Sequence, residues 1–179
     1  MYFYTPKFLA MDANFLQERN RFMLNQSALL GLIYVVFLLI LYFSGKLFSA
    51  SEKLSFLIWV GFIYYSSIKY RDKFFDGFIQ FEKIFSYGLR LMVLSGIISG
   101  FFYFVLLKID VELYSEQIDN LLELYSITGF YEGRIEEFES VLYESFPQLM
   151  FFSSILSSFF YGIVVSLIIA IFVKRKKIL

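Results

Sequence analysis

The chain has 179 residues, of which 59% are hydrophobic and 18% are charged, and its formal net charge is zero at pH 7. Soluble domains are about half apolar and about a quarter charged, so this composition excludes an ordinary water-soluble fold. Histidine and cysteine are absent, which excludes disulfides and the usual zinc sites and removes the most common general base. We expect a membrane protein that is not an enzyme, uses no cofactor or metal and binds no nucleic acid; lysine, tyrosine or carboxylate chemistry is the alternative left open.

The apolar runs are continuous, and few glycines or prolines interrupt them, which favours α-helices over a β-barrel. The predicted fold is all-α, with one polytopic membrane domain over residues 1–179. An amphipathic helical hairpin outside the bilayer is expected between the third and fourth spans, over residues 110–146. The four transmembrane helices are expected at about residues 25–44, 52–69, 84–109 and 147–173.

The N-terminal segment, residues 1–21, combines charged and aromatic side chains. Thr5-Pro6 has the form of a helix N-cap followed by proline at the first helical position. We therefore expect a short interfacial helix that leads into the first span.

The second span has the weakest signal of the four. Its uncharged run, residues 54–68, is shorter than the roughly 20 residues that a crossing normally needs. Lys53 and Lys69 at its ends can bury their aliphatic stems and place their ammonium groups at the lipid headgroups. On this basis we keep it as a span.

A hydrophilic loop joins the second span to the third, with Gly77 as its expected bend and a helix expected to follow from Phe78. Arg71 and Lys73 lie in this loop, close to the headgroups. They are candidates for contact with a lipid phosphate, although basic residues at this position most often only set the topology.

The insert over residues 110–146 contains ten acidic residues and one basic residue, Arg134. Its pattern is helical, since an acidic stripe and an apolar stripe alternate at helical spacing. We expect a turn at Thr128-Gly129 and a second amphipathic helix, and then a new helix starting at Pro147 with Ser145 as its cap. The acidic residues lack the spacing of a calcium-binding loop, so a solvated face is preferred over a calcium site. The apolar stripes comprise Tyr114, Ile118, Leu121, Leu122 and Tyr125 in the first helix and Ile135, Phe138 and Leu142 in the second.

The distribution of basic residues predicts the orientation. Twelve of the sixteen Lys and Arg residues lie in the N-terminal segment, the loop 69–90 and the C-terminal sequence KRKK. Four spans put these three segments on the same side, which the positive-inside rule assigns to the cytoplasm. Both termini are therefore expected in the cytoplasm and the acidic hairpin on the outer side.

Small residues recur on the third and fourth spans at the spacing of one helix face. Such faces let two helices approach closely, so packing of the third span on the fourth is the preferred reading. A homo-oligomer seam or a lined path is the alternative. No ionisable residue lies in the middle of a span, which argues against proton-driven transport. The expected helix-packing residues are Gly96, Gly100, Ser154, Ser158, Gly162 and Ser166.

Four features occur in order along the chain: YRD, a following GFI and F, a long hydrophilic insert, and the last span GIVVSLIIAIFVKRK. In these features the chain resembles the bacterial membrane proteins of the domain of unknown function 4199 family. The resemblance covers roughly residues 27–177. It implies four transmembrane helices in the inner membrane of Gram-negative bacteria, no established activity, and genes that often neighbour a polyprenyl-phosphate-type glycosyltransferase. The matching positions are Tyr70, Arg71, Gly77, Phe81, Gly88, Gly162 and Ser166.

Two functional hypotheses follow. The first is a scaffold or accessory subunit of the inner membrane, linked to envelope glycan or lipid metabolism, which binds a membrane or periplasmic protein through the acidic hairpin. The second is a lipid-carrier or small-solute translocator that uses the serine-bearing faces of the third and fourth spans. Membrane lipids are expected partners in both cases.

Overall fold

The computed structural model describes residues 7–49, 53–128 and 135–175, and its helices make the all-α fold that the sequence predicts. The described part contains five α-helices, one short 3-10 helix and one isolated β-bridge. The helices are α1 (Lys7–Phe43), α2 (Ser55–Phe74), α3 (Phe81–Ile109), η2 (Glu112–Tyr114), α4 (Ser115–Thr128) and α5 (Ile135–Val173).

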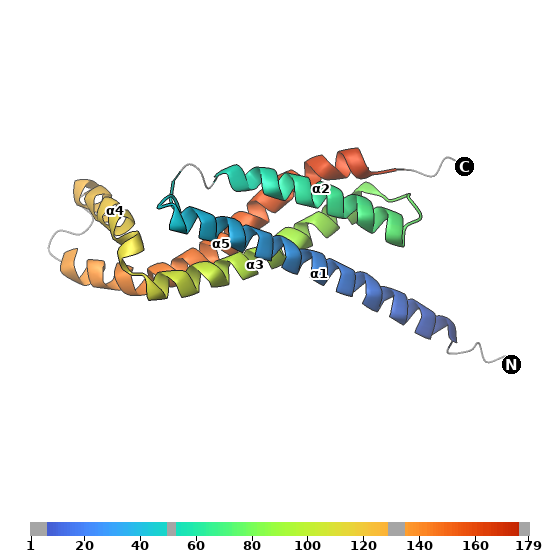
Figure 1. Ribbon diagram of the computed structural model, residues 1–179, viewed down its shortest axis with the longest axis horizontal. Helices are drawn as coiled ribbons and strands as arrows, with labels where there is room; N and C mark the ends of the chain where they lie inside the picture. Colours follow the sequence, from blue (N-terminus) through green and yellow to red (C-terminus); the bar gives the residue numbers. More distant parts are fainter. Residues whose placement is uncertain (1–6, 50–52, 129–134, 176–179) are drawn as a thin grey trace.

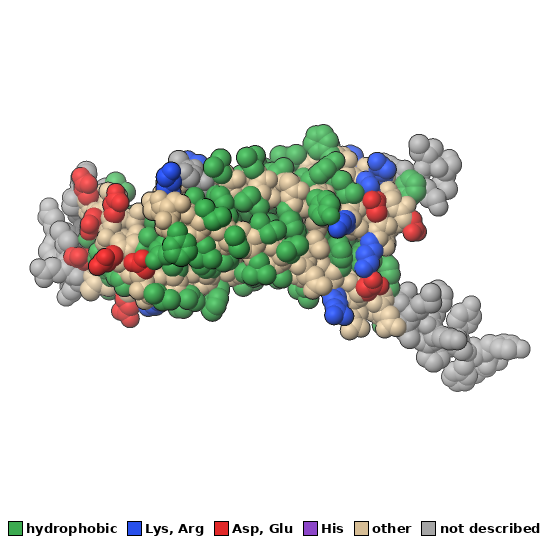
Figure 2. All heavy atoms as spheres, viewed as in Figure 1, with side chains coloured by type: hydrophobic (Ala, Val, Ile, Leu, Met, Phe, Trp, Pro, Cys, Tyr) green, Lys and Arg blue, Asp and Glu red, His purple; other side chains and the backbone are tan. Residues whose placement is uncertain are grey.

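Three of these helices contain segments that are long and apolar enough to cross a membrane. On the face shown in Figure 2, hydrophobic side chains cover the middle of the molecule, and charged side chains gather toward its two ends. These features indicate a multi-pass membrane protein, because an apolar band between polar ends is what a bilayer requires. The segments are Ala13–Phe43, Phe81–Ile109 and Phe138–Val173.

The helices are arranged along one long axis (Figure 1). The most extensive packing is between α3 and α5, followed by α1 on α3, and α2 contacts all three. The first turns of α1 extend beyond the other helices at one end, and α4 lies at the opposite end beside the first turns of α5. One buried apolar core runs through α1, α2, α3 and α5.

The helix starts differ from one prediction. Residues from Lys7 to Phe43 form one unbroken helix, so the helix expected in the N-terminal segment is continuous with the first span; Thr5-Pro6 lies outside the described residues. The loop before α3 does turn at Gly77, which has a left-handed φ of 82°. However, α3 begins at Phe81 and not directly after Gly77, because Ile79 instead forms the β-bridge with Arg175.

Pro147 lies inside α5, so the prediction that a new helix starts there is wrong. Proline has no N–H, and in a helix it leaves the carbonyl four residues earlier, that of Tyr143, without its usual donor. The structure supplies another donor, since the Tyr114 hydroxyl donates to this carbonyl oxygen over 3.2 Å. Ser145 is likewise not a cap, because its hydroxyl donates to the Val141 carbonyl within the same helix. The single helix α5 therefore contains both the second helix of the hairpin and the last apolar segment.

The hairpin formed by η2, α4 and the start of α5 has its own small core. The predicted apolar stripes face each other there: Tyr114 and Ile118 are buried against Leu142 and Phe146. The Tyr114 and Phe146 rings stack with centroids 4.7 Å apart. The acidic stripe faces solvent, as expected, with exposed Glu112, Glu116, Asp119 and Glu123.

Asp110 marks the junction between α3 and the hairpin. It follows the last residue of α3, and one of its carboxylate oxygens accepts a hydrogen bond from the Leu113 backbone N–H at the start of η2. The other oxygen accepts a hydrogen bond from the Tyr42 hydroxyl over 2.9 Å. Asp110 thus connects the ends of α1 and α3 to the hairpin.

Candidate functional site: a serine-lined cavity beside the α3 and α5 seam

The interface between α3 and α5, called the seam below, depends on glycines. A methyl group added to Gly96 would lie 2.5 Å from the Ser158 Cβ, and one added to Gly100 would lie 2.9 Å from the Phe151 carbonyl oxygen. From the other helix, a methyl group on Gly162 would lie 2.9 Å from the Met92 Cβ. Contacts this short show that the two backbones approach closely at these glycines.

The seam continues toward the C-terminal end of α5 at Gly88 and Ser166. A methyl group on Gly88 would lie 2.5 Å from the Ser166 Oγ. This hydroxyl oxygen is buried, and the structure shows no hydrogen-bond partner for it among the described residues. Shape, and not hydrogen bonding, therefore accounts for the fit of Ser166 against α3.

Most serines of the seam bond locally. Ser95 donates to the Met92 carbonyl over 2.8 Å, and Ser99 donates to the Gly96 carbonyl over 3.1 Å. Across the seam, the Ser99 and Ser154 hydroxyls lie 3.0 Å apart, and Ser154 also lies within 3.4 Å of the Gly96 carbonyl oxygen. These polar contacts join α3 to α5 directly.

A cavity of about 740 Å³ lies beside this seam, between α5 and the start of α2. Ser154 and Ser158 border it from the seam side, and Ser153 and Ser157 border it from the next face of α5. Its volume lies within the range of roughly 300–1,000 Å³ that is usual for small-molecule sites. The remaining lining residues are Tyr34, Phe48, Ser49, Lys53, Ser55, Phe56, Trp59, Tyr103, Met150 and Tyr161.

Aromatic rings form the walls of the cavity. Trp59 contacts Tyr34 edge to face at 5.3 Å and contacts Tyr161 at 5.4 Å between ring centroids, so this one side chain connects α2 to α1 and to α5. Phe48 stacks on Tyr103 at 6.5 Å on the opposite side. Aromatic walls with hydroxyl groups between them suit a ligand that has both apolar and polar parts.

Lys53 is the one charged residue among the described residues that line the cavity. It is exposed and forms no ion pair with any described residue. An ammonium group at this position favours an anionic or strongly polar head on the bound molecule. No group of acidic residues suited to holding a metal ion occurs among the described residues.

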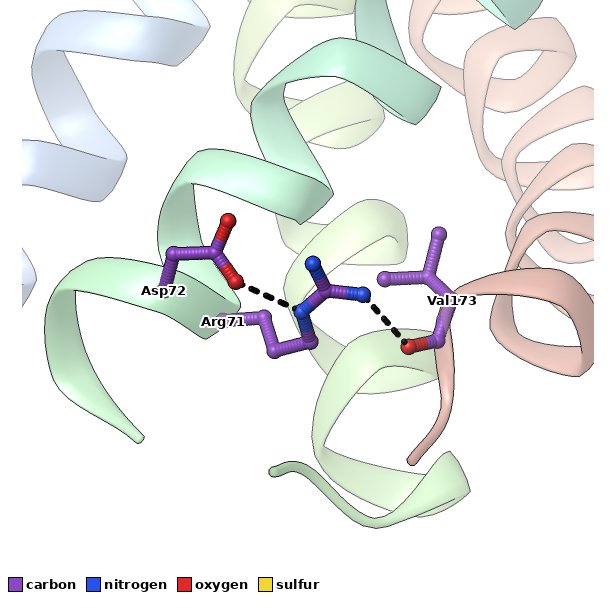
Figure 3. A network of polar contacts seen from close by, with 3 residues as sticks. All are labelled: Arg71, Asp72 and Val173. Carbon is purple, nitrogen blue, oxygen red and sulfur yellow. Dashed lines mark hydrogen bonds and ion pairs between the residues drawn. The ribbon is translucent and has the colours of Figure 1, made fainter. Parts of the chain in front are cut away.

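The two residues predicted to contact a lipid phosphate lie at the other end of α2. Arg71 is buried, and its guanidinium donates to the Asp72 carboxylate over 2.7 Å and to the Val173 carbonyl at the end of α5 over 3.4 Å (Figure 3). The hydrogen bond from Arg71 lowers the pKa of the exposed Asp72 carboxyl. Lys73 is half-exposed and pairs with Glu18 on α1 at 2.9 Å. Both cations are engaged by the protein, and their contact with lipid stays a prediction.

Reasoning from the sequence missed the cavity, although one signal for it was present. The run SSILSS at residues 153–158 places serines on two adjacent faces of a helix, and only the face with Ser154 and Ser158 was singled out. The second face, with Ser153 and Ser157, has no helix against it at this level and borders the cavity. Trp59 on α2 carried no comparable signal.

The chain was compared with known proteins. Residues 27–175 match the family described as protein of unknown function (DUF4199), so the match covers most of the chain. No curated protein and no solved structure matches the chain. The extent of the family match confirms the predicted resemblance: the chain belongs to the DUF4199 family.

Proposed function

We propose that α2 is a fourth membrane span. Its uncharged residues 55–68 rise about 21 Å, and Lys53 and Lys69 at the two ends can reach the headgroups, so Arg71, Asp72 and Lys73 lie beyond the span. It lies along the three apolar helices, and its outward face carries exposed Leu57 and Tyr65. With four spans the basic termini lie in the cytoplasm of the bacterial inner membrane and the acidic hairpin lies in the periplasm.

We further propose that the cavity binds an amphipathic molecule, so that the protein acts as a lipid-carrier or small-solute translocator. The observation that supports this function is the composition of the cavity wall, with four α5 serines, aromatic rings and Lys53 around about 740 Å³. In the four-span orientation the cavity lies toward the periplasmic end, near the α1–α2 turn. A polar head would reach Lys53 and the hydroxyls, and its apolar part would contact the rings.

Bound lipid provides the test. The full chain is purified in a mild maltoside detergent, and its lipids are extracted and identified by mass spectrometry. Ser157→Trp fills the cavity from an exposed position without touching the glycine seam, and Leu156→Trp is the matched control because Leu156 is exposed on the same helix outside the cavity lining. We expect one lipid class to be enriched over the bulk membrane with the natural chain and with Leu156→Trp, and to be lost with Ser157→Trp.

Two results would overturn this function. One is a lipid content equal to that of the surrounding membrane in the natural chain, together with no uptake of small polar solutes by vesicles that contain it. The other is an equal loss of bound lipid in both tryptophan variants, since this would show that the enriched molecule lies on the outer surface.

The second candidate function is an accessory subunit of the inner membrane that takes part in envelope glycan or lipid metabolism. The hairpin supports it, because its acidic face is exposed while its apolar stripes are used internally. Leu124 and Val141 remain exposed beside this face and would add apolar contact with a partner. A membrane or periplasmic protein with a basic surface would complement it.

Co-purification tests the second function. Glu116→Gln with Glu123→Gln removes two exposed charges of the hairpin, and Glu82→Gln at the other end of the molecule removes one exposed charge as a control. A stoichiometric partner should be retained by the natural chain and by Glu82→Gln, and reduced severalfold by the double variant. Isolation of the natural chain without any partner in several mild detergents would contradict the function.

A further inference from the structure

A second, smaller cavity lies at the opposite end of the helices, where α1, the end of α2 and the start of α3 meet. Its volume is about 230 Å³, below the usual range for sites that enclose a whole drug-sized molecule. It shares no lining residue with the serine-lined cavity. Among the described residues that line it, Arg19, Lys83 and Arg90 are basic and Glu82 is acidic.

The basic side chains of this cavity form no ion pair with any described residue. The ion pairs among the described residues join Arg71 to Asp72 and Lys73 to Glu18, and neither includes Arg19, Lys83 or Arg90. Arg19 on α1 and Arg90 on α3 both line this one cavity beside Tyr70. Like charges that converge in this way repel each other unless an anion lies between them.

The floor of the cavity is rigid. The Tyr70 and Tyr87 rings stack with centroids 4.0 Å apart and planes 11° apart. Behind them, the buried Tyr87 hydroxyl is hydrogen-bonded to Ser66, and Ser66 in turn donates to Gln26 on α1. This chain of contacts fixes the ring floor on three helices, so the basic groups surround a preformed space.

Neutral donors and the helix end add to the positive field. Asn20 and Ser86 line the cavity beside the basic groups. Lys83 lies in the first turn of α3, where backbone N–H groups carry the positive end of the helix dipole, and no side chain caps this turn. The Glu82 carboxylate is the one opposing group in the lining, and it is exposed.

We propose that this cavity binds the phosphate group of an anionic ligand, with Arg19, Lys83 and Arg90 as its principal contacts. Arginine forks and a lysine with adjacent hydroxyl and amide donors match the oxygens of a phosphate. The volume suits such a head alone, so the rest of the ligand lies outside the cavity. Two sources share this chemistry: the headgroup of a membrane lipid, whose chains would follow the apolar helix surface, and a soluble phosphate ester.

Binding to the full chain in maltoside micelles tests the site with three probes, measured by isothermal titration calorimetry. Dioctanoyl phosphatidic acid carries the phosphate and chains, sn-glycerol 3-phosphate carries the phosphate without chains, and dioctanoyl phosphatidylcholine is the zwitterionic control. We expect phosphatidic acid to bind at least tenfold more tightly than phosphatidylcholine. Equal binding of glycerol phosphate would identify the soluble source, and its failure to bind would identify the lipid source.

Variants assign the binding to the cavity. Arg19→Gln with Arg90→Gln should weaken phosphatidic acid binding about thirtyfold, which is roughly 1 kcal/mol for each cation. Ser86→Phe fills the cavity without a change of charge and should give a similar loss. Lys69→Gln is the control, since Lys69 is exposed near the end of α2 but does not line the cavity; its effect should stay below about twofold, as for one screened surface charge.

Circular dichroism during thermal unfolding verifies that each variant is folded. The two cavity variants are independent tests, because one removes positive charge and the other fills the space. The proposal is overturned if phosphatidic acid binds no better than phosphatidylcholine. It is also overturned if Lys69→Gln weakens binding as much as the double arginine variant, because the attraction would then be a general surface charge.

Discussion

Two faces of α5 carry serines at the same spacing but have different surroundings. The face that packs on α3 meets glycines, and its Ser154 and Ser158 lie at contact distance from the α3 backbone or side chains. The next face, with Ser153 and Ser157, meets the start of α2 across the serine-lined cavity. Serine spacing alone therefore does not define a seam. The residue type on the opposing helix decides whether a small side chain permits contact or leaves space.

The largest expected effect comes from breaking the seam. Gly96→Ala would put a methyl group 2.5 Å from the Ser158 Cβ and Oγ, and we expect it to destabilise the fold by about 2–3 kcal/mol, since close-packed helices cannot separate at one residue without losing neighbouring contacts. Thermal unfolding in detergent should show a fall in Tm of roughly 5–10 °C.

Gly61→Ala on α2 is the matched control. Gly61 is also a helical glycine, but a methyl group added there would have no atom within 4 Å. Its Tm should stay unchanged or rise slightly, since alanine favours the helix by up to about 1 kcal/mol. Equal destabilisation by both substitutions would show that the seam is looser than the distances indicate.

The hairpin part of α5 keeps its position relative to the two serine faces because the helix continues through Pro147. Tyr114→Phe removes the hydroxyl that donates to the Tyr143 carbonyl and retains the ring that stacks on Phe146. We expect a loss of about 1–2 kcal/mol, which is the usual cost of an unpaired polar group. Hydrogen exchange of the α5 backbone before Pro147 should become faster, and Tyr143→Phe should leave it unchanged because the Tyr143 hydroxyl makes no hydrogen bond among the described residues.

Pro147→Ala provides a further check on this explanation. Alanine restores the N–H that bonds to the Tyr143 carbonyl, so Tyr114→Phe should cost little in the Pro147→Ala background. An unchanged cost in that background would mean that the Tyr114 hydroxyl acts in some other way.

The sequence predicted the helix content and the described part of the hairpin's apolar stripes, because both depend on local periodicity. The start of the last helix was harder to predict. Pro147 usually marks a helix start, but here it lies inside a helix because the Tyr114 hydroxyl replaces its missing N–H as a donor. Tyr114 is 33 positions away in the chain, so no local pattern indicates this contact. The two cavities were not predicted, because each is defined by side chains from three or more helices whose relative rotation no local pattern fixes.

A finer comparison of the two faces uses single hydroxyls. Ser154→Ala removes a contact to the Ser99 hydroxyl and one to the Gly96 carbonyl, and we expect it to destabilise the fold by about 0.6 kcal/mol, the mean for hydrogen bonds between membrane helices. Ser157→Ala should have no measurable effect on stability, because Ser157 is exposed to the cavity. Unfolding by sodium dodecyl sulfate in mixed micelles resolves differences of this size, and an equal response of the two variants would remove the distinction between the faces.

The smallest expected effect concerns the far end of α2, where Arg71 connects it to the last carbonyl of α5. The hydrogen bond from Arg71 holds the pKa of the Asp72 carboxyl below the ordinary value of 3.8. A lowered pKa in the folded state means that this carboxylate adds stability above pH 3.8, and that the contribution is lost as the pH falls through the folded-state pKa. Because Asp72 is exposed, acidification from pH 6 to pH 2.5 should lower the Tm through this group by at most about 1 °C.

Asp72→Asn should reduce the acid sensitivity of the Tm by that amount. Asp76→Asn is the control, because Asp76 is exposed and forms no ion pair among the described residues, and it should leave the acid sensitivity as it is in the natural chain. If Asp72→Asn also left the acid response unchanged, the carboxylate would not assist Arg71. The contact of Arg71 with Val173 would then join the ends of α2 and α5 without help from Asp72, beside the buried Phe74 and Val173 of the core.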